Sequence, residues 1–321
     1  MKIAIIRLSA LGDIIQTATV VHFIKKHFAS AHISWVCDER FAKILEQIPD
    51  IDKIIKIPLK DKKITKTFLT LLANRHKFDY ILDFQGLIKS AICAKILGSN
   101  SYGFDENSIK ENVASKFYKH KIACDYNENV VIRYLTLASK ALGFSFEEKE
   151  ILEKPKIFSS AKYGLEPTTK KKVLIAPFAS EYSKCYPHFK FVVHDLIKDT
   201  QVYVCYGNKT EYNLALKIIF GSDAVLLPKM DILKMTGVVE EMDLVIGNDS
   251  AIPHLAWAQN KPSITLFGNR PSTRNAFVTP INLVADVGKF IDAKHIDKKD
   301  FCIKEIDPNL ICELARKLLN G

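Results

Sequence analysis

The chain has 321 residues, of which 48% are hydrophobic and 26% charged, and its formal net charge is +10. This composition predicts a soluble globular protein long enough for two domains, and it excludes an intrinsically disordered chain. No apolar run approaches the roughly 20 residues that cross a bilayer, and the first apolar run is too short for a signal peptide.

Seven cysteines are scattered along the chain, and none forms a Cys-x-x-Cys pair. The odd number and the irregular spacing predict reduced thiols in a cytosol rather than a zinc site or a disulfide framework. The positive charge is compatible with phosphates, anionic lipid or nucleic acid as partners, but lysines that do not cluster usually form only a solvated surface.

The first half of the chain alternates short apolar runs with segments of helical periodicity. We expect strands at residues 2–8, 33–37, 53–57, 80–83 and 102–103, and helices at 14–28, 40–47, 65–74, 87–97, 112–120 and 131–142. This alternation predicts a parallel sheet covered by helices on both faces.

Between residues 147 and 167 the pattern gives way to charged residues, Pro and Gly, which indicates a linker. The alternation then restarts. We expect strands at residues 173–176, 202–206, 224–227, 263–267 and from 244, and helices at 187–197, 211–219, 232–240, 308–319 and from 250 to 258. The sequence therefore predicts an α/β fold of two Rossmann-like, doubly wound domains, residues 1–155 and 165–321, which face a central cleft. The C-terminal helix at 308–319 could also pack back on the first domain.

The stretch from residue 244 to 268 predicts a buried strand that turns directly into a helix at Gly-Asn-Asp-Ser. Asp249 or Ser250 is placed to be the N-cap. The free N–H groups of that helix start, with its partial positive charge, favour an anion in the cleft. The alternative is that both residues only cap a structural helix.

Two further turns carry candidate chemistry. The first, Leu8-Ser9-Ala10-Leu11-Gly12-Asp13, has a single glycine and so lacks the Gly-x-Gly-x-x-Gly of a nicotinamide-binding domain. Asp13 there is either an N-cap or a general base that faces the cleft. Ser180 and Lys184 follow the strand at 173–176, where Lys184 beside a helix start can hold phosphate or can simply be solvated.

The residues resemble the lipopolysaccharide heptosyltransferases of glycosyltransferase family 9, which have the GT-B fold of two Rossmann-like domains. The likeness spans almost the whole chain and rests on motifs at residues 9–13, 83–90, 184–187, 228–230, 248–254 and 265–268. The first turn and residues 179–180 are most similar to members that add the first heptose to Kdo-lipid A. Another family 9 transferase, which adds the second or a later core heptose, is the alternative.

The resemblance implies an inverting transfer of heptose from ADP-heptose to Kdo, with Asp13 as the base that deprotonates the acceptor hydroxyl. The second domain would bind the nucleotide sugar. The implied donor contacts are Lys184 and Ser180 with the N–H groups of Ser250 and Ala251 for the diphosphate, Asp249 and His254 for heptose, Glu211 for ribose and Met230 for adenine. Lys184 would also counter the charge of the departing ADP, so that no metal and no other cofactor is called for.

The resemblance further implies that the first domain binds the acceptor. The basic residues that match acceptor-side positions are Lys60, Lys62, Lys63 and Lys110. We therefore expect a monomer in the cytoplasm, peripheral on the cytoplasmic face of the inner membrane, where Kdo-lipid A resides. A nucleic-acid-binding protein is the rival from another class, but no recognition helix or aromatic-rich binding strand is apparent in the sequence.

Overall fold

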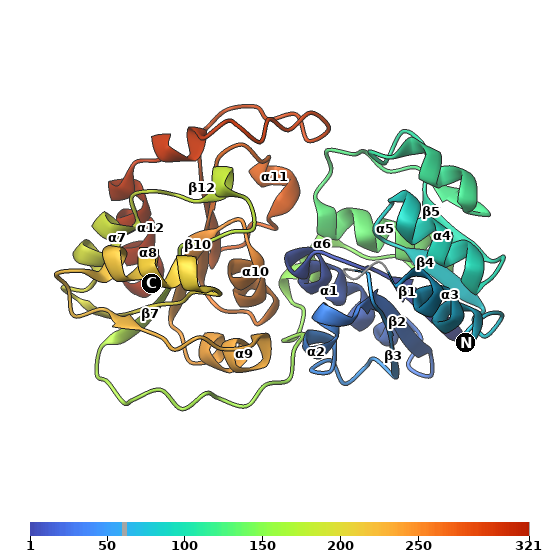
Figure 1. Cartoon of the computed structure of the whole chain (residues 1–321), viewed down its shortest axis with the longest axis horizontal. Coiled ribbons are helices and arrows are strands. Elements are labelled where there is room, and N and C mark those ends of the chain that lie inside the picture. The colour runs from blue at the N-terminus through green and yellow to red at the C-terminus, as the bar shows by residue number, and fades with distance from the viewer. Residues whose placement is uncertain (60–62, 321) are drawn as a thin grey trace. The chain divides into compact units, whose positions relative to one another are not determined.

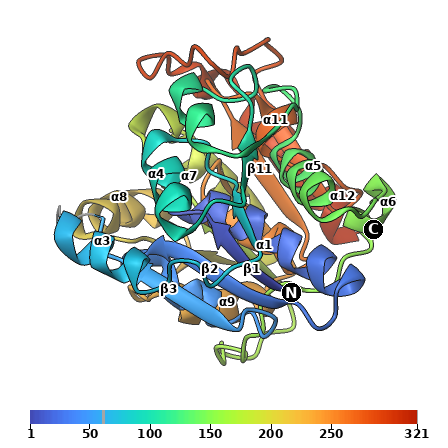
Figure 2. The same ribbon diagram turned by 90° about the vertical axis from the view of Figure 1, so that its right-hand side faces the viewer.

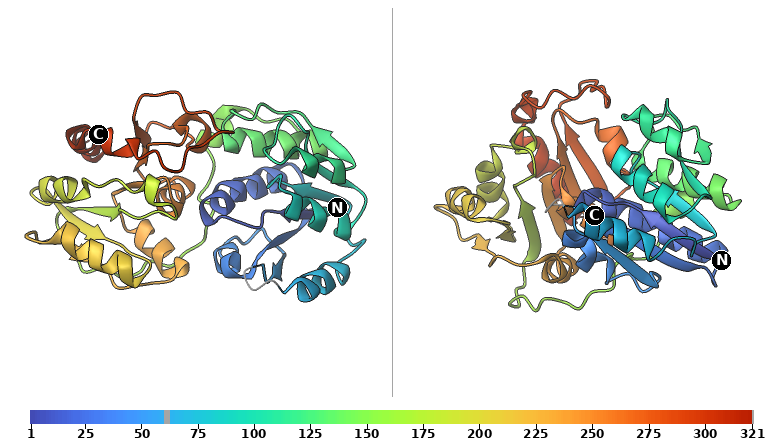
Figure 3. Two further views of the ribbon diagram at one scale, coloured as in Figure 1. Left: turned by 45° about the horizontal axis from the view of Figure 1, so that its top comes forward. Right: turned by 45° about the vertical axis from the view of Figure 1, so that its right-hand side comes forward.

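The computed structural model describes residues 1–59 and 63–320, and the chain divides between Ser159 and Ser160 into two compact units. Figure 1 shows each unit as a sheet with helices packed on it. The division falls inside the segment between residues 147 and 167 that has the composition of a linker. After it, the segment from 160 to 170 has no regular structure (Figure 3), and residues 161–163 lie against Gly237 of α9 (Ile232–Glu240) in the second unit.

Within the described residues, the first unit is built on a sheet of six parallel strands. They are β1 (Lys2–Ile6), β2 (His32–Asp38), β3 (Lys53–Ile57), β4 (Tyr80–Asp83), β5 (Ser101–Phe104) and β6 (His120–Ile122). Their order in space is β3-β2-β1-β4-β5-β6, which is the order of a doubly wound nucleotide-binding domain. The centre is β1, whose residues Ile3 to Ile6 are wholly buried because helices cover both faces.

Helices of the first unit lie on both faces of this sheet (Figure 2). One face carries α1 (Leu11–His27) and α5 (Val130–Leu142), which pack on each other. The other carries α3 (Ile64–Leu72), α4 (Ile88–Leu97) and the 3₁₀ helix η2 (Asn112–Phe117), each in contact with the next. Shorter elements complete the unit: η1 (Glu39–Phe41), α2 (Ala42–Leu45) and α6 (Glu148–Leu152).

The second unit repeats the same plan. Its strands are β7 (Lys171–Ala176), β8 (Thr200–Val204), β9 (Val225–Leu226), β10 (Leu244–Asn248), β11 (Ser263–Phe267) and β12 (Asn282–Asp286). They lie in the order β12-β11-β10-β7-β8-β9, again all parallel. Both sheets are thus parallel and doubly wound, as the alternating pattern predicts.

Two layers of helices cover the second sheet (Figure 1). One layer holds α7 (Phe189–Leu196), α8 (Lys209–Ile219) and α12 (Pro308–Asn320); the other holds α9 and α10 (Ala251–Ala258). The C-terminal α12 buries Ile311, Cys312 and Ala315 in the core of this unit. The remaining short elements are η3 (Tyr182–Lys184), α11 (Ser272–Asn275) and η4 (Cys302–Glu305).

The prediction of a helix at residues 112–120 is wrong for its last three residues. The helical turn is 3₁₀ and ends at Phe117, and β6 then pairs with β5. The reason is tertiary: the Tyr118 ring lies so close to Gly103 that a Cβ there would be 2.3 Å from Tyr118 Cε2. The Tyr118 hydroxyl donates to the buried Asp83 at 2.7 Å, and this anchors the chain in an extended conformation.

Other differences concern short elements that local sequence specifies weakly. The segment expected to be a linker contains α6, where Ile151 is buried. The expected helix start at Pro187 is two residues early, because α7 begins at Phe189. No element was expected where β12 adds to the sheet beside β11, since its sequence is short and partly polar.

The structure can be compared with the expectations of reduced cysteines and of no membrane-spanning segment. All seven cysteines lie within the described residues, and none is in a disulfide. Over residues 1–59 and 63–320, the structure contains no helix with the length and apolar character that a membrane span needs.

Candidate active site

The strand order reverses at one place in each sheet, between β1 and β4 in the first and between β7 and β10 in the second. Loops that leave adjacent strands at such a point diverge, and ligands of open α/β sheets bind in the crevice between them. The loops after these four strands contain most of the residues that the sequence singles out.

Asp13 lies in the first turn of α1, on the loop that follows β1. Its Oδ2 atom is 2.8 Å from Nη2 of Arg7 and accepts a hydrogen bond from the Ala10 N–H at 3.2 Å. The N-cap is Ala10, so Asp13 is not the cap itself but the third helical residue. The side chain is 39% exposed, and among the residues described no contact uses Oδ1. Oδ1 is therefore available to a further hydrogen-bond donor.

Arg7, which the sequence interpretation did not select, holds the Asp13 carboxylate in place. It is only 7% exposed, and its Nη1 donates to the Phe84 carbonyl at 2.8 Å. Burial lowers the pKa of the Arg7 guanidinium, but the charge and hydrogen bond of Asp13, together with Tyr134 and Asp83, outweigh burial and raise that pKa. An arginine directly after a fully apolar strand is a signal that could have identified it, because a charge at such a place needs a partner.

The loop after β4 supports the first turn from the neighbouring strand. Oε1 of Gln85 accepts hydrogen bonds from the N–H groups of Leu8 and Ser9, at 2.7 and 3.2 Å. Asp83 in turn accepts from the Gln85 N–H at 2.8 Å. Burial raises the pKa of Asp83, although the hydrogen bonds that it accepts from Ser90, Tyr118 and the backbone oppose the rise. The Asp83-Phe84-Gln85 segment is thus a support for the turn that carries Asp13.

In the second unit, Lys184, Asp249 and His254 form a buried cluster. Lys184 comes from η3 after β7, and its Nζ lies 2.6 Å from Oδ2 of Asp249 and 3.2 Å from the Asp249 carbonyl oxygen. Nε2 of His254 lies 3.1 Å from Oδ1 of the same carboxylate. The side chains of Lys184 and Asp249 are 17% and 9% exposed. Both carboxylate oxygens are therefore bonded, and Lys184 is held at the start of α10.

This cluster fixes the charge on Asp249. Burial by itself raises the pKa of the Asp249 carboxyl, but the charge of Lys184 and the hydrogen bond from His254 outweigh it and hold that pKa far below its usual range. Because an ionised carboxylate only accepts hydrogen bonds, Nε2 of His254 carries the hydrogen that is shared with Oδ1.

The same cluster makes the stability of the second unit depend on pH. The pKa of Asp249 is lower in the folded protein than the roughly 3.9 of an unfolded chain, so its ionisation stabilises the fold above about pH 4, and this stabilisation is lost as the pH falls further. The midpoint of thermal unfolding of the wild type is therefore expected to fall more steeply below about pH 4 than that of Asp249→Asn. Asp223→Asn, which removes an exposed carboxylate of the same unit, should keep the wild-type slope. Equal slopes for the wild type and Asp249→Asn would contradict this assignment.

Asn248, which was noted only as part of a motif, joins the two loops of this site. It is fully buried; its Nδ2 donates to the Pro177 carbonyl at 2.7 Å, and its Oδ1 accepts from the Tyr186 N–H at 3.1 Å. It therefore fixes the loop that carries Lys184 against the end of β10. The loop after β11 adds Arg270, which pairs with Glu181 at 2.9 Å between Nη2 and Oε2 and which the sequence left without a role.

The start of α10 has the geometry expected of an anion site. Ser250 occupies the N-cap position, as one of the two alternatives predicted, but its hydroxyl makes no capping hydrogen bond. Among the described residues the buried Ser250 hydroxyl has no partner at all. Ala251 is the first helical residue, and the first N–H groups of any helix lack intrahelical partners. Ser180 is exposed on the loop that leads to Lys184.

Two further predicted donor residues lie on loops at helix starts. Glu211, in the first turn of α8, accepts hydrogen bonds from the Gly207 N–H and from Nδ2 of Asn208, both at 2.6 Å. In this structure the Glu211 carboxylate thus binds to the residues that precede α8, at the start of its own helix. Met230 is half-buried directly before the N-cap of α9.

The predicted acceptor residues belong to the first unit. Lys63 is exposed at the N-cap position of α3, and Lys110 is exposed on the loop that precedes η2. Lys60 and Lys62 lie outside the described residues. No group of three or more His, Cys, Asp and Glu side chains within residues 1–59 and 63–320 is placed to hold a metal ion.

A family model described as "Glycosyltransferase family 9 (heptosyltransferase)" matches residues 69–299. The chain belongs to glycosyltransferase family 9. It is 44% identical to lipopolysaccharide heptosyltransferase 1 of Campylobacter coli over 339 residues, which cover 99% of each chain. The family 9 assignment makes the protein a glycosyltransferase, as the resemblance implies.

Solved structures of heptosyltransferases share the fold. The E. coli heptosyltransferase WaaC with ADP-2-deoxy-2-fluoro heptose aligns over 100% of both chains with a TM-score of 0.79 and 20% identity. E. coli ADP-heptose lps heptosyltransferase II aligns over 100% of this chain and 99% of that one, with a TM-score of 0.72 and 17% identity. The two doubly wound units are therefore those of the GT-B fold, which confirms the fold class predicted from the sequence.

Proposed function

We propose that this family 9 glycosyltransferase transfers L-glycero-D-manno-heptose from ADP-heptose to Kdo of Kdo-lipid A, with inversion at the anomeric carbon. The relative in Campylobacter coli, similar over the full length of both chains, is a lipopolysaccharide heptosyltransferase 1. A family 9 enzyme of the same fold has been solved with a fluorinated analogue of ADP-heptose. Both support this choice of reaction and donor.

One observation carries the assignment of the donor site: the ammonium group of Lys184 is held at 2.6 Å from Asp249, at the start of α10. A partly buried cation beside free helix N–H groups is suited to the diphosphate of a nucleotide sugar. We assign the diphosphate to Lys184, Ser180 and the N–H groups of Ser250 and Ala251. As the bond to the sugar breaks, the same groups stabilise the negative charge on the departing ADP.

The other donor contacts follow the resemblance and are proposals of the same kind. They are Asp249 and His254 for the heptose hydroxyls, Glu211 for the ribose and Met230 for the adenine. Glu211 already accepts two hydrogen bonds, so ribose hydroxyls would share or displace those from Gly207 and Asn208. Each Asp249 carboxylate oxygen accepts one side-chain hydrogen bond, from Lys184 or from His254, and can accept a second from a sugar hydroxyl, while the diphosphate competes with Asp249 for Lys184.

For the acceptor, Asp13 is the proposed general base. Arg7 holds Oδ2, which leaves Oδ1 to accept the proton of the attacking Kdo hydroxyl. The hydroxyl oxygen then forms the new bond to the anomeric carbon as the bond to ADP breaks on the opposite face. The basic residues Lys60, Lys62, Lys63 and Lys110 are assigned to the carboxylates and phosphates of the acceptor. We place the protein on the cytoplasmic face of the inner membrane, where it reaches this lipid.

The proposal is tested by release of ADP from the purified protein. We expect ADP release only when ADP-heptose and Kdo-lipid A are both present, and no GDP release when GDP-mannose replaces the donor. A product larger by one heptose should appear in the mass spectrum of the lipid. Transfer to heptosylated Kdo-lipid A but not to Kdo-lipid A would instead identify a later core heptosyltransferase of the same family. Turnover of GDP-mannose in place of ADP-heptose would refute the donor assignment.

A further inference from the structure

One layer of helices on the first unit exposes large apolar side chains to solvent. The α3–α4 face, as we call it, comprises Ile64, Phe68 and Leu69 of α3, Ile88 and Ile92 of α4, and Val113 of η2. Their exposed fractions run from 37% for Ile88 to 77% for Ile64. α3 contacts α4, and α4 contacts η2, so the side chains come from neighbouring helices of one layer; Figure 2 shows α3 and α4 on the same unit.

The exposed apolar residues of α3 and α4 follow the helical period. Ile64 and Phe68 are four residues apart on α3, and Ile88 and Ile92 are four apart on α4, so each pair projects from one side of its helix. Within α3 only Leu71 is fully buried. Single exposed apolar residues are common in folded proteins, but a group on adjoining helices marks a surface that binds something.

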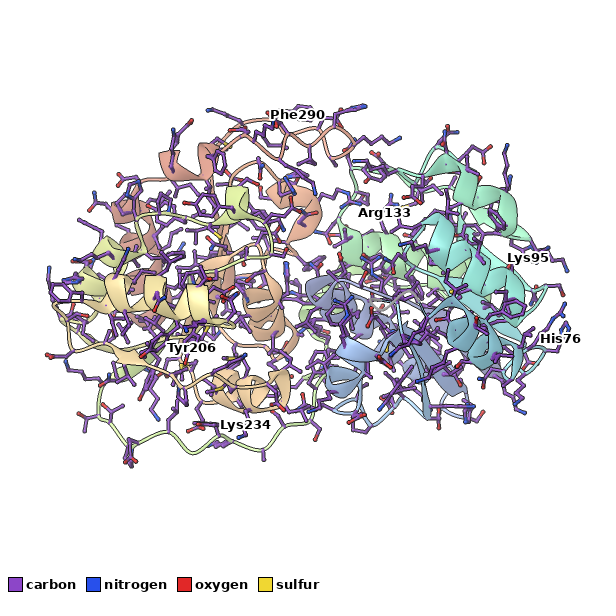
Figure 4. All side chains as sticks on the ribbon, in the orientation of Figure 1. His76, Lys95, Arg133, Tyr206, Lys234 and Phe290 are labelled. Atoms are coloured by element: carbon purple, nitrogen blue, oxygen red, sulfur yellow. The ribbon has the colours of Figure 1, made fainter. Side chains whose placement is uncertain are left out.

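The charge around the α3–α4 face indicates what it binds. From residue 63 to 117, across α3, α4 and η2, the chain has eight Lys and Arg and five acidic residues, and the exposed Glu111 accepts a hydrogen bond from the Ile88 N–H at 2.8 Å. Asp83 is fully buried, so it adds no acidic surface. The helices and their ends present exposed lysines: Lys63, Lys66, Lys89 and Lys95. Figure 4 shows Lys95 at the surface of the first unit. Apolar side chains bordered by lysines are typical of elements that lie in the interface of an anionic bilayer.

We propose that the α3–α4 face docks on an anionic lipid bilayer, with Phe68, Leu69 and Ile92 among the acyl chains and the lysines at the headgroups. This deepens the proposed function, on which it rests for its biological setting. Lys63 and Lys110, assigned to the acceptor, lie at the start of α3 and before η2, at the border of this face. Docking here therefore presents the acceptor side of the protein to the surface that holds a lipid acceptor. A symmetric dimer through this face would instead bring the same lysines against each other, which is unfavourable.

The test is binding of the full chain to vesicles that contain no acceptor, so that it does not depend on the transferase reaction. We expect the wild type to sediment with phosphatidylcholine vesicles that contain phosphatidylglycerol, and to remain largely in solution with phosphatidylcholine alone. Phe68→Ser/Leu69→Ser and, separately, Lys66→Glu/Lys89→Glu should each lower the partition coefficient about tenfold or more. Added salt should weaken binding of the wild type.

Matched changes on the second unit serve as controls. Phe290→Ser removes an exposed aromatic ring (Figure 4), and Lys190→Glu/Lys217→Glu reverses two exposed charges; both should bind vesicles as the wild type does. The α3–α4 variants should retain the wild-type midpoint of thermal unfolding, which shows that they fold.

Binding of Phe68→Ser/Leu69→Ser to anionic vesicles at the wild-type level would overturn the proposal. A concentration-dependent dimer that these substitutions abolish would overturn it too, in favour of an interface between copies of the chain. Absence of heptose transfer combined with the expected vesicle binding would refute only the proposed reaction.

Discussion

Asp13→Asn is expected to lower kcat for heptose transfer by about two to four orders of magnitude, the usual contribution of a general base. The amide keeps the size of the side chain and can still accept hydrogen bonds from Arg7 and the Ala10 N–H, so the turn should be preserved. What it loses is the ability of Oδ1 to take a proton. The donor contacts that we propose are all on the second unit, so the Kd for ADP-heptose, measured by calorimetry, should stay within about twofold of the wild-type value.

Two controls separate this chemistry from a loss of structure. Asp50→Asn removes an exposed carboxylate of the same unit and should leave kcat unchanged. Asp13→Asn deprives the buried Arg7 of its counter-charge, so its unfolding midpoint should be measured and kcat compared well below it. Wild-type turnover by Asp13→Asn would exclude the base role, whereas equal losses of kcat and donor affinity would indicate a structural role.

Lys184→Met is expected to weaken ADP-heptose binding by about 10- to 150-fold, since a hydrogen bond to a charged group contributes about 1.5–3 kcal/mol. It should also destabilise the free protein. Asp249 would remain buried with only His254 as a partner, and removing one member of a buried ion pair costs up to about 3–5 kcal/mol. Calorimetric titration with ADP-heptose measures the first effect and denaturant unfolding the second.

The double variant Lys184→Met/Asp249→Asn distinguishes the two effects. Removal of both charges leaves no unpaired carboxylate, so the double variant should recover much of the stability lost by Lys184→Met. It should not recover donor affinity if Lys184 is the cation that binds the diphosphate, as we propose, because that cation is still absent. If the double variant bound ADP-heptose as the wild type does, Lys184 would be a structural partner of Asp249 and not a phosphate ligand.

The central strands can be predicted from the sequence, because a strand that is buried on both faces consists of a continuous run of apolar residues. Ile3 to Ile6 and Leu244 to Ile246 are continuous apolar runs, and both became fully buried central strands. The long helices were predicted for a similar reason, since one side of each must pack on the sheet and so repeats at helical spacing. The parallel, doubly wound class followed from the alternation of these elements.

Edge strands cannot be predicted from the local sequence, because they are stabilised by pairing with strands that are distant in the sequence. β6 exists because it pairs with β5 and because Tyr118 is anchored to Asp83, and β12 exists because it pairs with β11. The pattern at residues 112–120 predicts a helix throughout, and only the pairing of β6 with β5 ends it at Phe117 and starts a strand at His120.

For the candidate site, the sequence by itself determined which residue types stand at the ends of strands: a carboxylate after β1, a lysine after β7 and Asp-Ser after β10. Only the tertiary structure decided what each of them contacts. Arg7 and Asp13 are near in the sequence, and they pair because β1 ends between buried layers. Lys184 and Asp249 are 65 positions apart, and they meet because β7 and β10 are neighbouring strands. Gln85 and Asn248 stabilise loops that lie 77 and 71 positions away. Periodicity in the sequence indicates only the local secondary structure and which side of it is buried. The hydrogen-bond partners of a buried polar group are set by the strand order, which places residues that are distant in the sequence next to each other.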